Sequence, residues 1–259
     1  MEPLQVKIPP LGLLRSFGLI LLAATSLTLV GALHAEPPEK ILFVGNSYTG
    51  QVRAAVSKFF AASPHKEIEL EFITPGGRTL VQHLGNASTM KRINEGGWDI
   101  IVLQDQSQTP AVLPEKFLDA SRKLNAMIEN AGARTAYYQT WGRRDGDRAN
   151  AERFPTYLKM QAALSKSYEK AAERDDAILV TVGEAWRVVR KEKPEMGRRL
   201  YKKDGSHPSA SGAYLAACCF YAALTGGDPR EVAFDGGLAA DEAKFLREMA
   251  SSEPTEAPE

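Results

Sequence analysis

The stretch that decides the fold is Ile41-Leu42-Phe43-Val44, a run of four apolar residues that leads directly into Gly45-Asn46-Ser47-Tyr48-Thr49. A second continuous apolar run occurs at Ile100–Leu103. Runs of this kind are typical of strands that are buried on both faces of a parallel sheet. We therefore predict that both segments are buried strands.

The rest of the chain alternates short apolar segments with helical patterns. The predicted strands are Lys40–Val44, Glu67–Ile73, Asp99–Leu103, Arg134–Tyr138 and Ile178–Val182. The predicted helices are Val52–Ala62, Leu80–Glu95 with a break, Glu115–Asn130, Phe154–Arg174, Ser209–Thr225 and Ala239–Ala250. Repeated strand–helix units imply an α/β fold, a parallel sheet with helices on both faces. In such sheets, ligands bind beyond the carboxyl ends of the strands.

The composition is that of an ordinary globular protein. The chain has 259 residues, of which 44% are hydrophobic and 25% charged, and its 32 basic side chains balance 32 acidic ones. A net charge of zero gives no global field that would attract nucleic acid or an anionic membrane. The two cysteines, Cys218 and Cys219, are adjacent in an apolar run. Because neighbouring cysteines rarely pair, we interpret them as buried small hydrophobic residues.

The N-terminal segment has the features of a secretory signal peptide. A basic region precedes a long apolar run, and small residues at Ala32 and Ala35 offer two cleavage sites. We predict a signal peptide over residues 1–35, one folded domain over 36–250 and a disordered polar tail over 251–259. With such a signal peptide, we expect the protein to be exported to the periplasm or outside the cell. The alternative is an uncleaved membrane anchor, because the apolar run just reaches the length needed to span a bilayer.

Ser47 lies three residues after the first predicted strand, where a helix is predicted to begin near Gly50. A serine there stands at the carboxyl edge of the sheet and near a helix N-terminus. Backbone N–H groups and the helix dipole at such a place can stabilise an oxyanion. The alternative is that Asn46, Ser47 and Thr49 only cap the helix.

The segment Asp204-Gly205-Ser206-His207-Pro208 places a carboxylate three residues before an imidazole. Of the four histidines, His34 lies in the predicted signal segment, His65 in a polar turn and His83 in a helical stretch, so only His207 has a carboxylate spaced to orient it. A base oriented in this way can take a proton from a serine hydroxyl. The pattern therefore predicts a serine hydrolase with the order Ser, Asp, His. A plain surface turn is the alternative.

Two further features follow predicted strands. Gln104 comes directly after Asp99–Leu103, and its side-chain amide could donate to an oxyanion at the same edge of the sheet. Gly76-Gly77 follow the second strand, where a glycine lets a backbone N–H approach the same oxygen. A polar loop and a plain turn are the alternatives. The location of all these features at strand ends of one sheet favours the functional interpretation.

Trp141 follows the fourth predicted strand. Its indole could stack on a sugar ring or line an acyl pocket, and a core tryptophan is the alternative. The charged segment Arg143–Arg148 could bind an acidic sugar, although charge runs are more often solvated faces.

Taken in this order, these motifs resemble those of the SGNH (GDSL-like) hydrolase superfamily. The similarity is greatest to exported bacterial members with Gly-Asn-Ser in place of Gly-Asp-Ser, and it spans Ile41 to about Gly226. The resemblance implies a three-layer α/β/α, flavodoxin-like fold with a five-stranded parallel sheet. It also implies that Ser47 is the nucleophile, His207 the base and Asp204 the residue that orients the base.

The same resemblance implies an oxyanion hole. Its donors would be the N–H of Ser47, the N–H of Gly77 and the side chain of Gln104, which stands where the family usually has an asparagine. The choice between Gly77 and its neighbour Gly76 stays open. Asn46 replaces the usual aspartate. Asn46 and Trp141 are candidates for substrate binding.

From these features we expect a serine esterase acting on short-chain acetyl esters, with an O-acetylated carbohydrate as its small-molecule or polysaccharide substrate. A lipid esterase, lysophospholipase or thioesterase is an alternative, although the sequence has no obvious long apolar lid. A non-catalytic carbohydrate-binding protein that kept the fold is the alternative from another class. The sequence has no His-Glu-x-x-His, no paired cysteine spacing and no glycine-rich nucleotide loop, so we expect neither a metal nor a cofactor.

Overall fold

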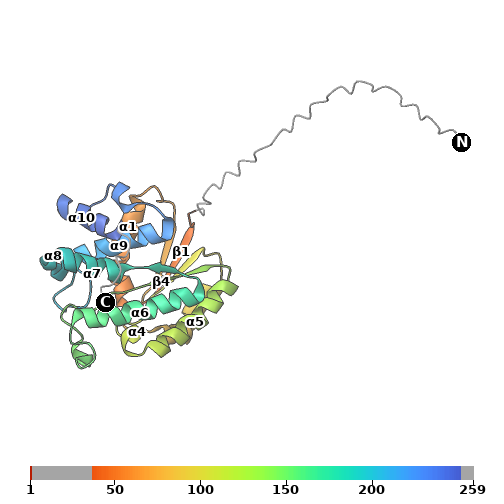
Figure 1. The fold of residues 1–259 in the computed structure, drawn as a ribbon, viewed down its shortest axis with the longest axis horizontal. Helices are drawn as coiled ribbons and strands as arrows, with labels where there is room; N and C mark the ends of the chain where they lie inside the picture. The colour runs from red at the N-terminus through yellow and green to blue at the C-terminus, as the bar shows by residue number, and fades with distance from the viewer. Residues whose placement is uncertain (2–36, 252–259) are drawn as a thin grey trace, which may run out of the picture. The chain divides into compact units, whose positions relative to one another are not determined.

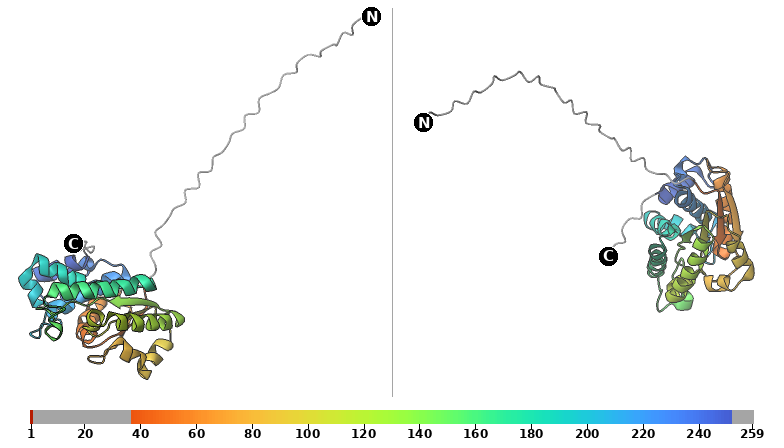
Figure 2. Two further views of the ribbon diagram at one scale, coloured as in Figure 1. Left: turned by 60° about the horizontal axis from the view of Figure 1, so that its bottom comes forward. Right: turned by 90° about the vertical axis from the view of Figure 1, so that its right-hand side faces the viewer.

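A computed structural model describes Met1 and residues 37–251 of the chain. Within them, five parallel strands form a sheet in the order β2-β1-β3-β4-β5. The strands are β1 Lys40–Val44, β2 Glu69–Ile73, β3 Ile100–Leu103, β4 Arg134–Tyr138 and β5 Ile178–Val180. Helices cover both faces of the sheet (Figures 1 and 2), which confirms the predicted three-layer α/β/α fold with a five-stranded parallel sheet.

The helices divide into two layers. They are α1 Ser47–Ala61, α2 Leu80–Leu84, α3 Ala87–Asn94, α4 Thr109–Val112, α5 Pro114–Asn130, α6 Tyr157–Asp175, α7 Val182–Glu192, α8 Pro194–Arg199, α9 Ala210–Thr225 and α10 Ala240–Ser251, with 3-10 turns at Arg148–Asn150 and Pro229–Glu231. On one face, Ile41 and Phe43 of β1 pack with α1, α7, α9 and α10. On the other, Leu42 and Val44 pack with α2, α3, α5 and α6. The run of four apolar residues is thus buried from both sides, as predicted.

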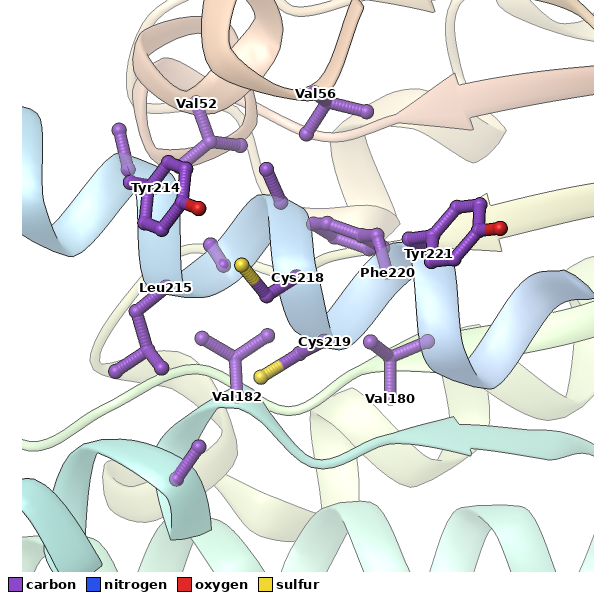
Figure 3. Close-up of a cluster of buried hydrophobic side chains, with 14 of the residues drawn as sticks. Val52, Val56, Val180, Val182, Tyr214, Leu215, Cys218, Cys219, Phe220 and Tyr221 are labelled. Carbon is purple, nitrogen blue, oxygen red and sulfur yellow. The ribbon is translucent and has the colours of Figure 1, made fainter. Parts of the chain in front are cut away.

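Helix α9 lies inside its layer and is apolar around most of its circumference. Figure 3 shows its side chains between Val52 and Val56 of α1 on one side and Val180 and Val182 on the other. Such a helix is typical of the core of a protein, because no face of it is left for solvent. Cys218 and Cys219 are free and buried in this cluster, which confirms their interpretation as small hydrophobic residues.

Several element boundaries differ from the predictions for local reasons. Helix α1 begins at Ser47 rather than near Gly50, because the side chain of Asn46 caps it by accepting from the N–H of Tyr48. The fifth strand ends at Val180, and Val182 already belongs to helix α7, which the sequence analysis missed together with α8. The break expected within Leu80–Glu95 separates α2 from α3.

The predicted signal peptide over residues 1–35 lies outside the described residues apart from Met1, and so does the predicted tail apart from Ser251, which ends α10. In the part of the chain that the structure describes, no helix has the length and apolar character that crossing a membrane requires.

The strand order determines where a ligand can enter. The chain passes from β1 outward to β2 and then returns to the other side of β1 to form β3. At this reversal the connections leave the carboxyl ends of β1 and β3 toward opposite faces, which opens a crevice between them. Both Gly45–Thr49 and the polar segment after Leu103 begin at this crevice.

Candidate active site

The structure brings the three predicted residues of the triad together. The Oγ of Ser47 lies 3.0 Å from Nε2 of His207, although the two residues are 160 positions apart in the chain. The Nδ1 of His207 lies 2.7 Å from Oδ2 of Asp204. Ser47 and His207 are half-buried, and Asp204 is exposed. A serine, an imidazole and a carboxylate are therefore connected in the order that a nucleophile, a base and an orienting group require.

Asp204 is held by its own turn. Its Oδ1 accepts the backbone N–H of Ser206 at 2.9 Å and that of His207 at 3.0 Å. Burial alone would raise the pKa of Asp204, but the hydrogen bonds from the His207 ring and from the two backbone N–H groups outweigh it and hold this pKa below its usual value. The ionised carboxylate favours the tautomer with a proton on Nδ1 of His207. The Nε2 is then free to accept the proton of Ser47.

Asn46 is part of the framework of the nucleophile turn. Besides capping α1, its Nδ2 donates to the backbone carbonyl of Arg78 at 2.9 Å. This bond ties the loop that contains Gly76 and Gly77 to the residue next to Ser47. Asn46 is 2% exposed. The geometry therefore gives Asn46 a structural role rather than the substrate contact expected from the sequence.

Gln104 holds the same turn from the end of β3. Its Oε1 accepts the backbone N–H of Asn46 at 3.0 Å and the hydroxyl of Thr49 at 2.8 Å, and its Nε2 donates to the carbonyl of Asp105. The side chain is fully buried. A β-carbon at Gly45 would lie 2.7 Å from this Oε1, which explains the glycine at that position. These contacts give the amide of Gln104 a role in holding the turn, while its role as an oxyanion donor stays a prediction.

Two backbone N–H groups are the other predicted oxyanion donors. The first belongs to Ser47, the first residue of a 15-residue helix, where the helix dipole favours negative charge. The second belongs to Gly77, which is exposed and has a φ of 67°, a conformation that suits glycine. The Gly77 loop is fixed at its far end, where the N–H of Leu80 donates to Oδ1 of Asp105 at 3.0 Å.

Trp141 supports the turn that carries Asp204 and His207. It is fully buried and stacks between Tyr48 and Trp186, with ring centroids 5.0 and 3.8 Å away. Its Nε1 donates to the backbone carbonyl of Ser206 at 2.9 Å. Because the ring is fully buried, no face of it is left to stack on a sugar. The structure therefore favours the alternative that Trp141 is a core tryptophan over a contact with substrate.

Arg143 belongs to a buried network that the sequence analysis missed. Its guanidinium donates to the hydroxyl of Ser206 at 2.5 Å and to that of Ser107 at 3.1 Å. The hydroxyl of Tyr48 lies 2.8 Å from the same Ser206 hydroxyl. Burial raises the pKa of Tyr48, so its phenol stays protonated. The network joins the ends of β3 and β4 to the residue before His207.

His83 fixes the start of the nucleophile turn. It is fully buried, with Nε2 2.9 Å from the carbonyl oxygen of Gly45 and Nδ1 3.2 Å from the hydroxyl of Thr89. Burial lowers its pKa from 6.5 to about 4, with a smaller effect from the charge of Arg78. The ring is therefore neutral at pH 7 and donates from Nε2 to Gly45. No sequence pattern indicates this role, because the partner is a main-chain carbonyl.

A cavity of about 430 Å³ borders the acid–base turn, lined in part by Asp204, Gly205 and Arg143. Among the described residues, no cluster of three or more His, Cys, Asp or Glu side chains could hold a metal ion.

Comparison with known proteins finds similar solved structures. No protein-family model and no curated protein matches the sequence. Among solved structures, a presumed SGNH hydrolase from Slackia heliotrinireducens is 26% identical over 71% of this chain and 98% of its own, with a TM-score of 0.62. A DUF4886 family protein from Bacteroides uniformis is 19% identical over 82% and 92%, with a TM-score of 0.66. An acetyl xylan esterase is 13% identical over 71% and 99%, with a TM-score of 0.57.

The chain thus combines a five-stranded parallel sheet with a serine after the first strand and an Asp-x-x-His turn beside that serine. The solved structures that the chain resembles, which include an SGNH hydrolase and a GDSL-like lipase, support its resemblance to the SGNH (GDSL-like) hydrolase superfamily.

The role of Gln104 can be tested by Gln104→Met, which keeps the side chain's length. The N–H of Asn46 and the hydroxyl of Thr49 then lose their acceptor in a buried place, so we expect the free energy of unfolding to fall by about 1–3 kcal/mol. Urea denaturation measures this, with the half-buried Gln51→Met on α1 as control. Unchanged stability together with a roughly 10²–10³-fold lower kcat would instead indicate an oxyanion donor.

His83 should make folding sensitive to acid. Its pKa is about 4 in the folded protein and 6.5 ordinarily, so between these values the unfolded chain binds a proton that the folded protein does not. The contribution of neutral His83 is complete above pH 6.5 and is lost as the pH falls toward 4, by about 3 kcal/mol in total.

The variant His83→Gln can still donate to Gly45 but does not titrate. The free energy of unfolding of the wild type minus that of the variant should therefore decrease by about 3 kcal/mol from pH 7 to pH 4. Urea titrations at several pH values measure it. Asp105, whose pKa burial raises to about 7, is present in both proteins, so its titration cancels in the difference. A difference that is independent of pH would contradict the assignment.

Proposed function

We propose that the protein is a serine esterase in which Ser47 attacks an ester carbonyl. The observation that carries the proposal is the chain of hydrogen bonds from Ser47 through His207 to Asp204. Ser47 is half-buried rather than buried, so part of the residue is accessible from outside. The likeness to solved SGNH hydrolases supports ester hydrolysis in general.

In the first half of the proposed reaction, the Oγ of Ser47 bonds to the carbonyl carbon while its proton moves to Nε2 of His207. The oxygen of the tetrahedral intermediate takes the negative charge and is stabilised by the N–H groups of Ser47 and Gly77. Ionised Asp204 stabilises the imidazolium that forms. The imidazolium then gives its proton to the alcohol oxygen as the carbon–oxygen bond breaks, which leaves an acyl group on Ser47.

In the second half, water takes the place of the alcohol. His207 accepts a proton from water while the water oxygen attacks the acyl carbon, and the intermediate collapses to release the acid. The proton returns from His207 to Ser47. No cofactor is needed for any of these steps.

We further propose acetyl esters of carbohydrate as the substrate class. The cavity beside Asp204 has a lining rich in polar and charged side chains, among them Arg148 and Lys203, which suits a hydroxylated alcohol better than an acyl chain of many carbons. A solved structure with the same fold is that of an acetyl xylan esterase. The N-terminal sequence supports export, and an exported esterase would meet polysaccharides of the cell surface or its surroundings.

The nucleophile can be tested with a fluorophosphonate probe, which reacts covalently with an activated serine. We expect the wild type to be labelled on Ser47 and Ser47→Ala to be unlabelled and inactive. The exposed Ser88→Ala, on helix α3, is the matched control and should behave like the wild type. Resistance of the wild type under conditions in which known serine esterases react would favour the non-catalytic carbohydrate-binding alternative.

With the same proteins, acetyl, butyryl and longer-chain esters of one alcohol give the acyl preference. We expect the highest kcat/KM for the acetyl ester and no activity of Ser47→Ala above background on any of them. A preference for long chains would favour the lipid esterase or thioesterase alternative.

The orienting role of Asp204 can be tested by Asp204→Asn. The amide oxygen can still accept the N–H groups of Ser206 and His207, but the amide NH₂ then faces Nδ1 of His207 and pushes the ring proton to Nε2. We expect kcat to fall by roughly 10²–10⁴-fold with the fold retained. Steady-state kinetics and thermal melting measure both. The exposed Asp241→Asn on α10 serves as control, and a kcat equal to that of the wild type would refute the role.

A further inference from the structure

A second, larger cavity lies next to the one beside the acid–base turn. Its volume is about 550 Å³, and it lies between the start of α6 and the second half of α7. The two cavities share Arg144 and Asp145 in their linings. The two cavities are therefore neighbours, and a long substrate in the first could extend toward the second.

The larger cavity carries an excess of positive charge. Asp145, the one carboxylate among its lining residues, is paired with Arg144 at 2.9 Å and with Arg198 at 3.2 Å. Two lining cations, Arg190 and Lys191, have no carboxylate within 4 Å among the described residues. The side chain of Lys191 is exposed. An anion bound here would meet uncompensated cations rather than an existing ion pair.

Arg190 is fixed in place and is connected to the acid–base turn. Its guanidinium lies 4.0 Å above the ring of Tyr157, and its Nη2 donates to the backbone carbonyl of Arg144 at 3.0 Å. The N–H of Arg144 in turn donates to the carbonyl of Gly205 at 2.9 Å, next to Ser206. These two hydrogen bonds connect the side chain of Arg190, through the main chain of Arg144, to the turn that contains Asp204 and His207.

The smaller cavity, beside the acid–base turn, also has exposed cationic side chains. Arg148 and Lys203 are exposed at the smaller cavity. Asp147, a carboxylate in its lining, is 2% exposed and accepts from Gln108 and Asn150, each at 2.7 Å. The carboxylate of Asp204 is hydrogen-bonded to Nδ1 of His207. The lining of the smaller cavity as a whole contains four cationic side chains and three carboxylates, Asp145, Asp147 and Asp204.

We propose that this pair of cavities binds an anionic group on the substrate, such as a carboxylate, sulfate or phosphate carried by a sugar. The preferred substrate is then an acylated acidic carbohydrate rather than a neutral one. Leu158, which is 64% exposed at the larger cavity, offers apolar contact for the C–H face of a sugar ring. The inference rests on the proposed esterase function and narrows its substrate.

The test compares three mono-O-acetylated methyl glycosides: a hexuronate, the corresponding neutral hexose and the hexose 6-phosphate. We expect kcat/KM for the charged esters to exceed that for the neutral ester by roughly 5-fold, the effect of about one exposed ion pair. The difference should appear mainly in KM and should shrink as salt is added. The hexuronate and phosphate arms show which anion is preferred, and either preference supports the proposal.

Lys191→Glu puts the opposite charge at the cavity on an exposed helix position. We expect it to abolish or reverse the preference while leaving hydrolysis of the neutral ester unchanged. Lys166→Glu, exposed on α6 but not part of the cavity lining, should keep the preference. Equal kcat/KM for charged and neutral esters in the wild type would overturn the anionic site and leave the esterase proposal standing.

A binding measurement keeps the two proposals separable. Calorimetry with Ser47→Ala and an unacetylated oligohexuronate should show binding that Lys191→Glu weakens by roughly 5-fold or more. Hydrolysis of none of the esters would overturn the esterase function, while this titration would still test the anionic site. No binding of the oligohexuronate and of its phosphorylated counterpart would overturn the site.

Discussion

The amide oxygen of Gln104 accepts two hydrogen bonds, from the N–H of Asn46 and the hydroxyl of Thr49, and so joins the carboxyl ends of β1 and β3. Everything at the site depends on this junction, because Ser47 lies between the two donors. His83 holds the carbonyl of Gly45 from the opposite direction. Such a buried junction leaves little freedom to the turn, since each lost partner costs about 1–3 kcal/mol. The nucleophile is therefore positioned by buried side chains that are distant from it in the sequence.

The acid–base turn is fixed in a similar way from the end of β4. Trp141 donates to the carbonyl of Ser206, Arg143 donates to its hydroxyl, and the N–H of Arg144 donates to Gly205. Loops that follow three neighbouring strands thus set the distance between Ser47 and His207. Asp204 itself is exposed, and its contacts all lie within its own turn. This division explains how a local Asp-Gly-Ser-His segment can act with a serine 160 positions away.

The sequence was sufficient for the features that are local. Continuous apolar runs predicted the buried strands, and the Gly-Asn-Ser and Asp-x-x-His segments predicted the residues that the structure brings together. What a side chain does once it reaches the edge of the sheet depends on distant neighbours. Gln104 and Trp141 both follow strands, as predicted. Their burial involves residues that are distant in the sequence, since Gln104 accepts from Thr49 and Trp141 stacks on Trp186. Helix α7 was missed because it starts within the apolar run that was assigned to the fifth strand.

The pair formed by Trp141 and Trp186 has an optical consequence. The two indoles are stacked with centroids 3.8 Å apart and planes 10° from parallel, so their electronic transitions couple. One member of the pair also donates to the carbonyl of Ser206, next to His207. A small shift of that turn would change the near-ultraviolet circular dichroism and the fluorescence of the pair. The protein thus contains a built-in chromophore that reports on the position of its own acid–base turn, without any added label.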